Sequence, residues 1–383
     1  MRIETLNNRV FLYFQTTDLQ EFDGFRVYRS TTPEDSGFIP LAYIPAGQKQ
    51  FIDSTVTTGR WYYYRATLLA AGQESLPSNT VKALLGPGSV WVLSRYGYSL
   101  HHLAYDLENT INIIGTNYPP KSWAPDFVNK QIWTAYPPFG LIGHINLILN
   151  YEDQLIGDSL KAPNRLAAFP DKNTLFVADT LVNRIFVLKN GTVENNLNVS
   201  AKGVHKLLVT SNRHLYVLYK SRLAIFNFAG QLQKNIFFPT GFEGTDLRGQ
   251  NGLVLAIAAG PEAHQTALLK IDDAQLQHTQ KIMNGYFRLL RPLPGVDEFW
   301  AVENLPENSS RLVKLSPDGI RLLELSDFDY ILDLAVNPAD FSLVIINAPP
   351  NYGYTREIQL RNEDGTLLNR IHIFDALKVA ISE

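Results

Sequence analysis

The chain has 383 residues, with 34 basic and 37 acidic side chains and a formal net charge of −3. This near balance gives no field that would steer it toward nucleic acid or an anionic membrane, so we expect neither as a partner. Cysteine is absent, which excludes disulfides, thiolate metal sites and a cysteine nucleophile. No apolar run approaches the roughly 18 residues of a membrane span, and no signal peptide is visible after Met1, although a processed exported protein would look the same.

Short strand patterns separated by turn residues occupy the first part of the chain. Apolar and β-branched runs at 10–14, 24–30 and 61–75 alternate with segments rich in Pro, Gly, Asp and Ser. Several short strands at this spacing predict a β-sandwich. We therefore place a first domain at residues 1–85.

Four segments of this domain carry a resemblance to a known family. They are the FRVYRS strand, the FID segment, the Gly-x-x-Tyr-x-Tyr-Arg run that begins at Gly59, and the AAGQESLPSNTV ending. Together they resemble a fibronectin type III domain over about residues 5–85. The resemblance implies that Tyr62 forms a tyrosine corner and that the domain is a spacer or adhesion unit.

A repeated unit fills the second domain, residues 86–383, after a short GPGS linker. One complete unit at 163–190 contains the strand-like runs RLAAFP, TLFVAD and RIFVLK. Runs like its second strand recur at a spacing of roughly 40 residues, which suits four-stranded blades. The pattern predicts an all-β β-propeller with seven blades, or with six if one unit is something else. The central residues of these runs are Trp91, Trp133, Phe176, Tyr216, Val254, Trp300 and Val344.

The unit at 163–190 also resembles an NHL repeat. In that family the second strand ends in an Asp followed by an Asn-Arg-Ile run, which here are Asp179 and residues 183–185. The resemblance implies an NHL-like propeller over about residues 89–383, of which six blades is the commoner form. We interpret Asp179 as a structural turn residue.

Blade one lacks a first strand of its own before Ser89. The apolar run at 376–382 can supply this strand and close the ring. Closure of this kind removes the exposed sheet edges that an open ring would leave.

The predicted first strands share a charged leading residue, and first strands line the central channel of a propeller. Because buried charges must be paired, we favour a structural ring of ion pairs over a ligand site. Propellers related to gluconolactonase hold a metal at the channel mouth, and the matching positions here would be Asp126, Asp246 and Asp333. Basic residues in the same ring argue against a cation, so we expect no metal. The seven leading residues are Asp126, Arg165, Lys206, Asp246, Arg288, Asp333 and Lys378.

The loops of the propeller sort by face. Those between first and second strands and between third and fourth strands are short and polar, whereas those on the other face are long and carry aromatic residues. Exposed rings on a rigid scaffold are typical of binding surfaces, so we predict that a protein, peptide or glycan docks on blades seven, one and two. The alternative is that each ring packs under its own loop. The predicted residues are Tyr96, Tyr98, Tyr118, Trp123, Tyr136, Phe139, Tyr352 and Tyr354.

No motif for catalysis is present: there is no phosphate-binding glycine loop, no Gly-x-Ser-x-Gly elbow and no His-Glu-x-x-His helix. His101 and His102 are adjacent on a strand, so their side chains point to opposite faces and should not share a metal. We therefore predict a non-catalytic binding or scaffolding protein with no cofactor and no catalytic residue. The alternatives are an enzyme of the lactonase or lyase type with a site at the channel mouth, and a structural subunit of a larger cell-surface assembly.

The pairing of these two modules resembles bacterial exported proteins more than cytosolic ones. We therefore expect an extracytoplasmic location, which could be periplasmic, cell-surface or secreted.

Overall fold

The computed structural model describes residues 1–6, 9–15, 22–57, 60–157, 159–169, 173–250, 252–261, 264–293, 295–349 and 353–382. Regular structure in these ranges consists of strands and short 3-10 turns. Accordingly, none of the described residues forms a helix that could cross a bilayer. The 3-10 turns are Asp35–Gly37, Pro137–Phe139 and Pro306–Asn308.

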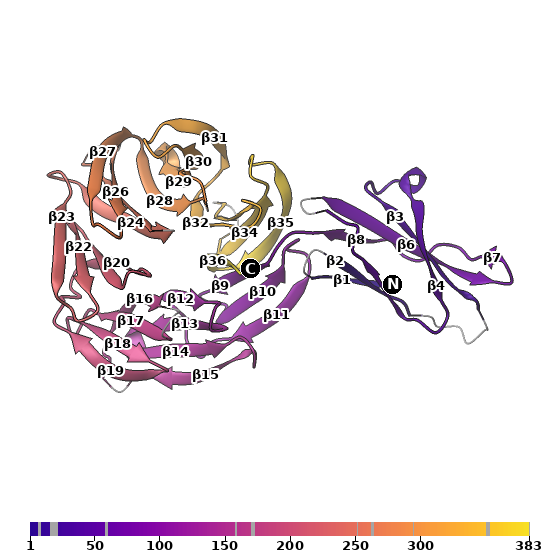
Figure 1. Ribbon diagram of the computed structural model, residues 1–383, viewed down its shortest axis with the longest axis horizontal. Coiled ribbons are helices and arrows are strands. Elements are labelled where there is room, and N and C mark those ends of the chain that lie inside the picture. The colour runs from indigo at the N-terminus through magenta and orange to yellow at the C-terminus, as the bar shows by residue number, and fades with distance from the viewer. Residues whose placement is uncertain are drawn as a thin grey trace.

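Strands from the first part of the chain form two sheets that lie beside the ring of the second part (Figure 1). Leu12, Val27 and Tyr64 are among the fully buried side chains between these sheets. The first sheet contains β1 (Arg2–Leu6), β2 (Arg9–Tyr13) and β5 (Gln50–Asp53). The second contains β3 (Gly24–Ser30), β4 (Ile39–Pro45), β6 (Trp61–Ala70), β7 (Gln73–Glu74) and β8 (Val81–Leu84).

Tyr62, at the start of β6, makes the contact expected of a corner tyrosine. Its hydroxyl accepts a hydrogen bond of 3.0 Å from the backbone N–H of Thr57, and it lies 2.9 Å from the Thr57 hydroxyl. This bond fixes the turn that leads into β6, and the ring of Tyr62 is buried in the core between the sheets.

Within the described residues, seven four-stranded antiparallel sheets surround a central axis, and we number them as blades one to seven along the chain (Figure 1). Blade one contains β36 (Ala376–Ser382), β9 (Ser89–Ser94), β10 (Ser99–Ala104) and β11 (Thr110–Gly115). Blade two contains β12 (Ser122–Asp126), β13 (Gln131–Tyr136), β14 (Leu141–Asn146) and β15 (Tyr151–Ile156). Blade three contains β16 (Pro163–Phe169), β17 (Thr174–Asp179), β18 (Arg184–Lys189) and β19 (Thr192–Leu197).

The remaining blades follow the same order from the axis outward. Blade four contains β20 (Val204–Val209), β21 (His214–Tyr219), β22 (Arg222–Asn227) and β23 (Leu232–Phe237). Blade five contains β24 (Glu243–Gln250), β25 (Leu253–Ala259), β26 (Gln265–Asp272) and β27 (His278–Asn284). Blade six contains β28 (Tyr286–Pro292), β29 (Phe299–Asn304), β30 (Ser310–Leu315) and β31 (Arg321–Phe328). Blade seven contains β32 (Ile331–Val336), β33 (Leu343–Asn347), β34 (Thr355–Arg361) and β35 (Leu367–Phe374).

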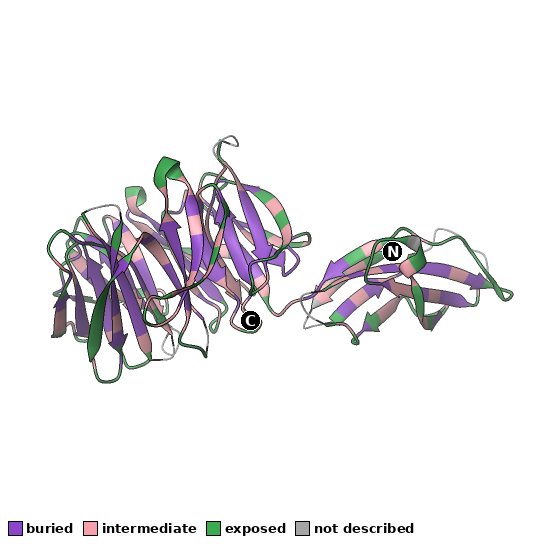
Figure 2. Cartoon of the chain, turned by 90° about the horizontal axis from the view of Figure 1, so that it is seen from above, coloured by how far each residue is buried: buried purple, intermediate pink, exposed green. Residues whose placement is uncertain are grey.

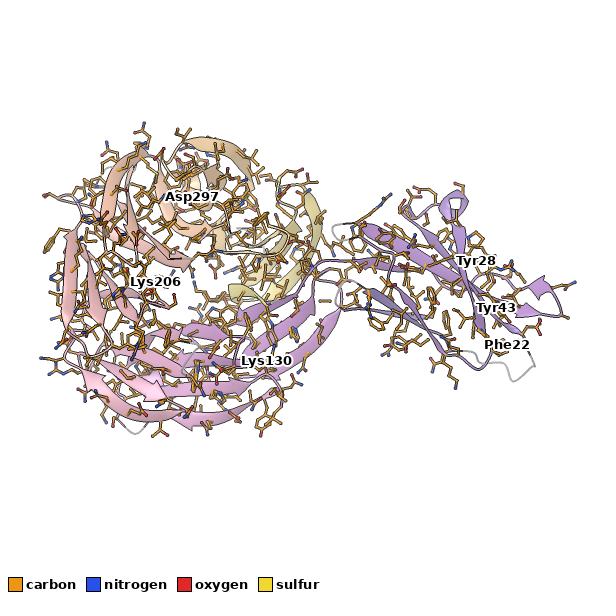
Figure 3. The ribbon with its side chains drawn as sticks, viewed as in Figure 1. Phe22, Tyr28, Tyr43, Lys130, Lys206 and Asp297 are labelled. Atoms are coloured by element: carbon orange, nitrogen blue, oxygen red, sulfur yellow. The ribbon has the colours of Figure 1, made fainter. Side chains whose placement is uncertain are left out.

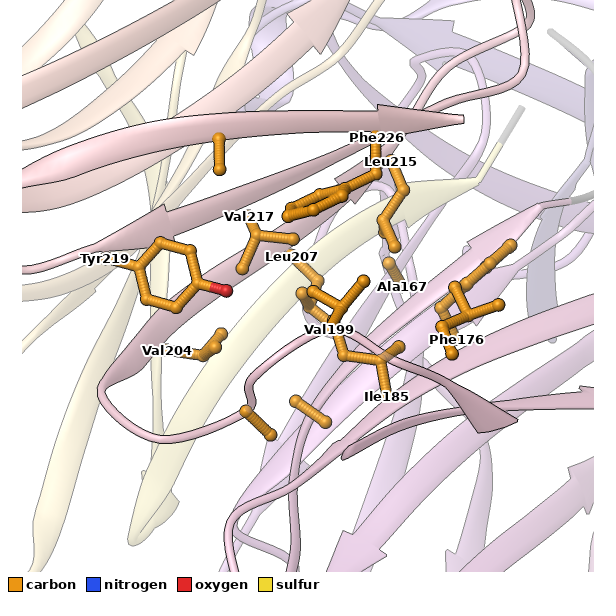
Figure 4. Packing of buried hydrophobic residues seen from close by; sticks show 14 of the residues in the cluster. Ala167, Phe176, Ile185, Val199, Val204, Leu207, Leu215, Val217, Tyr219 and Phe226 are labelled. Carbon is orange, nitrogen blue, oxygen red and sulfur yellow. The ribbon is translucent and has the colours of Figure 1, made fainter. Parts of the chain in front are cut away.

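Second strands are apolar on both faces because each is covered by a blade on either side. All six residues of β17 are buried. The interface between blades three and four shows the packing: Phe176 and Ile185 of blade three share one buried apolar cluster with Leu207 and Val217 of blade four (Figure 4). Figure 2 shows the same distribution over the whole ring, with buried residues along the strands and exposed residues at the loops.

The predicted closure of the ring by the C-terminal strand is confirmed. β36 pairs antiparallel with β9, from Ala376 opposite Ser94 to Ser382 opposite Ser89. The Ser382 hydroxyl also lies 2.8 Å from the Ser89 hydroxyl and accepts a bond of 3.2 Å from Nε1 of Trp91. Strands from the two ends of the propeller segment therefore share one blade.

The two sheets at the N-terminus contact the propeller on the side of the short loops. Nε1 of Trp61 donates to the Leu368 carbonyl at 3.4 Å, and Lys82 forms a 2.6 Å ion pair with Glu108. In the linker, a Cβ on Gly86 would lie 2.1 Å from Cζ of the buried Tyr105 ring, so only glycine fits there. These contacts leave the face with the long loops uncovered.

His102 is held neutral inside blade one, whereas its neighbour His101 faces the other way. The His102 ring stacks on Trp91 at 3.8 Å, and its Nε2 lies 2.7 Å from the Ser89 hydroxyl. Nε2 of His101 instead contacts the Ser99 hydroxyl at 3.0 Å. Burial lowers the pKa of His102 to about 4. The two rings thus have separate partners.

We expect this histidine to make stability depend on pH. Its ordinary pKa is 6.5 and its folded pKa is lower, so the unfolded chain binds the proton first as the pH falls. Stability should be complete above pH 6.5 and should drop by about 1 to 2 kcal/mol toward pH 4, since water reaches part of the ring. Urea melts at pH 7 and pH 4.5 measure the change. His102→Gln should reduce it, with a remainder from His101, whose pKa burial also lowers. The exposed control His264→Gln should leave it unchanged; an equal pH effect in both variants would contradict this assignment.

Candidate functional site

The face with the long loops, called here the long-loop face, carries the predicted aromatic residues of blades seven, one and two. The loops involved join second to third strands within a blade, or fourth strands to the next blade. Three of the rings are half-exposed: Tyr96 at 48%, Phe139 at 49% and Tyr354 at 59%. Tyr98, at a positive φ of 49°, is also exposed. The structure thus brings several rings from separate loops to one surface.

The first group of rings lies where blade seven meets blade one. Tyr96 and Tyr354 meet edge to face with ring centres 6.0 Å apart, and Tyr354 meets the exposed Phe374 at 6.1 Å. The Arg95 guanidinium lies 4.2 Å from the centre of the Tyr96 ring. The Asp375 carboxylate accepts the Tyr96 backbone N–H at 3.1 Å and lies 3.5 Å from Nε of Arg95. These contacts hold the rings in place before any partner binds.

The second group lies between blades one and two. Tyr118 stacks on Phe139 with ring centres 4.1 Å apart. The two groups are joined through the backbone, because the N–H of Thr116 donates to the Tyr98 carbonyl at 2.8 Å and the Thr116 hydroxyl donates to the Tyr118 carbonyl at 3.1 Å. We define the aromatic sector as Tyr96, Tyr98, Tyr118, Phe139, Tyr354 and Phe374.

One predicted residue is buried below this surface, a second is only partly buried, and a third lies outside the described residues. Tyr136 is fully buried, because it is the last residue of β13 and its hydroxyl donates to the Glu152 carboxylate. Burial and this carboxylate raise the pKa of Tyr136. Trp123 lies in β12 and packs against the apolar cluster around Trp91. Tyr352 lies outside the described residues.

Sequence reasoning missed two members of the site region, Phe374 and Arg95. Phe374 ends β35 and would have been visible as an apolar residue immediately before the connection to blade one. Arg95 lies directly before Tyr96, where its guanidinium can cover the ring.

Charged side chains of the first strands form a connected network in the channel. It passes from Lys206 through Asp246 and Arg291 to Asp333 and Lys378, and so links blades four, five, six, seven and one. The Asp246–Arg291 pair is at 3.4 Å and the Asp333–Lys378 pair at 3.8 Å, while Lys206–Asp246 and Arg291–Asp333 are closer. Figure 3 labels Lys206 at the inner rim of the ring.

The two carboxylates stay ionised although they are buried. Burial alone would raise the pKa of Asp246, but the neighbouring cations, first Lys206 and then Arg248, hold it well below its ordinary value. Burial alone would also raise the pKa of Asp333, but Lys378 and Arg291 lower it. Burial lowers the pKa of Lys206, and the charge of Arg248 adds to this effect.

Asp126 does not lie in this network, although the sequence pattern placed it there. It pairs with Gln131 at the far end of β12, and its carboxylate accepts 2.8 Å and 2.7 Å bonds from the side-chain amides of Gln131 and Asn129. It therefore shapes the turn on the side of the short loops. Pairing shows Ser122, opposite Ala135, at the other end of the same strand.

Arg288 is also displaced from its predicted place. A β-bulge between Phe287 and Leu289 shifts the register of β28, and Arg288 occupies the extra position. Its guanidinium lies 4.4 Å from the Tyr330 ring centre, and its Nε donates to Oδ1 of Asn304 at 2.6 Å. Arg291, three residues further along, supplies the ion pairs instead.

Arg165 lies at the channel, but it forms hydrogen bonds with neutral groups. Its guanidinium donates to the His205 carbonyl at 2.6 Å and to Asn164 at 2.9 Å. Burial lowers the pKa of Arg165. Among the residues that the structure describes, no three His, Asp or Glu side chains gather closely enough to hold a metal ion.

The carboxylate of Asp179 forms hydrogen bonds with backbone N–H groups of two loops. Asp179 is fully buried, and its carboxylate accepts from the backbone N–H groups of Lys161 and Ala162 on one side and of Leu181 and Val182 on the other, at 2.6 to 3.1 Å. This geometry is that of a turn-forming residue.

Comparison with known sequences assigns no family, because no family model matches the chain. A stretch of 103 residues is 27% identical to an amylopullulanase of Thermoanaerobacter thermohydrosulfuricus; it makes up 27% of this chain and 7% of that protein. This chain is therefore similar to only a small part of that enzyme.

Solved structures are similar over most of the chain. A protein from Lactobacillus plantarum has a TM-score of 0.62 at 15% identity, covering 77% of this chain and 99% of that one. The RRP9 WD40 repeats have a TM-score of 0.53 at 10% identity, covering 68% and 83%. The hydrazine synthase of Kuenenia stuttgartiensis also has 0.53 at 10% identity, covering 64% and 77%. At such identities the likeness shows a β-propeller fold and nothing finer, so the NHL and fibronectin type III resemblances stay predictions.

Proposed function

We propose that this chain is a non-catalytic binding or scaffolding protein whose main partner is another protein that docks on the aromatic sector. The observation that carries the proposal is the contiguous set of half-exposed rings from blades seven, one and two. Rings on preordered loops offer large contact area with little side-chain entropy to lose, which is why tyrosine and arginine are enriched where proteins bind one another.

The shape of the surface favours a protein over a small molecule. Small ligands bind in concave pockets. Two cavities among the described residues, of about 560 Å³ and 460 Å³, lie elsewhere: one beside Gln154 between blades two and three, the other at the channel mouth beside Arg288. The aromatic sector lies outside these hollows, and a broad surface with a nearby arginine, Arg95, suits a protein partner.

The N-terminal sheets are placed so that they can serve as an attachment arm. They contact the propeller through Trp61 and Lys82 on the side of the short loops, and so leave the aromatic sector free. We further propose an extracytoplasmic location, which rests on the combination of a fibronectin-like module with a propeller. A role as a subunit of a larger assembly fits the same arrangement.

A glycan is the second candidate partner, because a stretch of 103 residues is 27% identical to part of an amylopullulanase. Native electrophoresis through gels that contain amylopectin or pullulan separates the two candidates. A protein-binding sector predicts unchanged mobility in both gels. Retarded migration that is abolished by Tyr96→Ala with Tyr354→Ala would replace the protein partner with a glycan.

Site-specific photo-crosslinking tests the proposal directly. A benzophenone amino acid is placed at position 96, 139 or 354, and the full chain is exposed to extracts of its native cells. Tyr151, on the outer strand β15 and 51% exposed, gives a control of matched exposure. We expect one shared adduct from the three sector positions and none from position 151. The same adducts from position 151, or none from the sector, would contradict the proposal.

A further inference from the structure

The channel carries more positive than negative charge among the described residues. Its two network carboxylates, Asp246 and Asp333, are contacted by four cations, namely Lys206, Arg248, Arg291 and Lys378. Arg165 and Arg288 add two further cations, and their hydrogen bonds to His205, Asn164 and Asn304 all go to neutral groups. Buried charges are tolerated when they are paired, so this excess calls for an anion.

Arg288 is a cation that the protein satisfies incompletely. Its Nε is bonded to Asn304, whereas Nη2 has no hydrogen-bond partner. Burial lowers the pKa of this guanidinium. The side chain is held in place by Asn304 and Tyr330 and is only partly buried, so its guanidinium is preorganised to bind an oxyanion at its accessible side.

A cavity opens beside this arginine at the channel mouth, on the long-loop face. It has a volume of about 460 Å³, and its lining includes His205, Glu243, Thr245, Tyr286 and Arg288. Glu243 already forms a 2.7 Å ion pair with Lys220 at the exposed edge. The volume falls in the range of roughly 300 to 1,000 Å³ that is typical of small-ligand sites.

Three consecutive blades deliver side chains to this cavity in the same way. A β-bulge interrupts β20 between Val204 and Lys206, β24 between Gly244 and Asp246, and β28 between Phe287 and Leu289. The extra residues are His205, Thr245 and Arg288, and all three line the cavity. Because bulges redirect a side chain out of the regular alternation, the repeat supplies an imidazole, a hydroxyl and a guanidinium to one place.

We propose that this cavity binds the phosphate or carboxylate group of a small molecule, with Arg288 as the direct partner and the Tyr286 hydroxyl as a further donor. The Thr245 hydroxyl, which donates to the Ile257 carbonyl at a long 3.4 Å, turns to the ligand as a third donor. Lys206, Arg248 and Arg165 supply the positive field behind it. The site belongs to blades four, five and six, and it is independent of the aromatic sector on blades seven, one and two.

Calorimetric titration of the full chain tests the site with inorganic phosphate, sulfate and succinate, each at the ionic strength of a sodium chloride reference. We expect at least one oxyanion to bind where chloride does not. Arg288→Gln should weaken that binding by about tenfold or more, because it removes a charged donor. Arg213→Gln is the matched control, since it removes an exposed arginine near the opposite end of blade four.

One further variant keeps the test decisive. If Arg288→Gln does not fold, Thr245→Val removes one hydroxyl without changing charge and should still weaken binding. A preference for phosphate and sulfate identifies a phosphoryl-type ligand, and a preference for succinate identifies a carboxylate. Binding that is absent for all three anions, or that Arg213→Gln weakens as much as Arg288→Gln, would overturn the proposal. Crosslinking at the aromatic sector would be unaffected, so the two proposals fail separately.

Discussion

A chain that ends at Asp375 should lose most of the stability of its propeller. The deletion removes β36, which pairs with β9 along its whole length and buries Ala376 and Val379. It also exposes the edge of β9 and removes Lys378 from the channel network. We expect the free energy of unfolding to fall by about 5 kcal/mol or more, which is comparable to the whole stability of many domains.

Thermal and urea melts of the truncated and full chains measure this effect. A chain shortened only by Glu383 is the control and should melt like the full chain. If the chain that ends at Asp375 unfolds at the same temperature as the full chain, β36 is not needed for closure, and the assignment of blade one would have to change.

Replacing Asp333 with alanine should be the most damaging single substitution in the channel. Asp333 is buried, pairs with Arg291 and Lys378, and accepts the backbone N–H of Val379 at 3.2 Å. Its removal leaves Arg291 buried with less compensation. Losing one partner of a buried pair costs about 3 to 5 kcal/mol, so we expect a loss of this order.

A matched control isolates the effect of burial. Asp297, labelled in Figure 3, has a side chain 76% exposed and lies 3.9 Å from Lys270. Asp297→Ala should change the free energy of unfolding by less than about 0.5 kcal/mol. A melt of Asp333→Ala that matches Asp297→Ala would show that the network is not structural. Normal stability with lost crosslinking at the aromatic sector would instead mark the network as part of a binding site.

The strongest sequence signals predicted the fold because they reflect which side chains are buried. In runs such as TLFVAD, residues that point to both faces of the strand are apolar. This pattern is typical of a strand that is covered on both faces. The missing first strand of blade one and the surplus strand at 376–382 predicted the closure by the same reasoning. These features depend on hydrophobic pattern alone, which can be read without knowing the register.

The channel was harder to predict because its residues depend on register. One extra residue in a first strand moves the following side chains to the other face, and bulges of this kind carry no clear sequence signal. This is why Arg288 was assigned to the network in place of Arg291, and why the cavity formed by His205 and Thr245 was not anticipated. Asp126 was misplaced because the first strand of blade two begins earlier than the repeat suggested, at Ser122, so that Asp126 is its last residue.

The aromatic sector was predicted in part. Tyr96, Phe139 and Tyr354 belong to loops, and their exposure follows from that position. Tyr136 belongs to the end of β13, where the alternation of the strand turns it inward to Glu152. At the boundary between a strand and a loop, a strand that is one residue longer can bury a side chain that would otherwise be exposed. Sequence patterns do not define the ends of strands to one residue.

The central claim, that blades seven, one and two carry the docking surface, is tested most directly by affinity. The measurement is the dissociation constant of the crosslinked partner for the intact chain, for Tyr96→Ala with Tyr354→Ala, and for Tyr151→Ala. The two tyrosines, if they anchor the interface, should together contribute at least about 2 kcal/mol, so the paired substitution should weaken binding by at least about thirtyfold, whereas Tyr151→Ala should leave it unchanged. Equal affinity of the intact chain and the paired variant would contradict the claim and place the docking surface elsewhere.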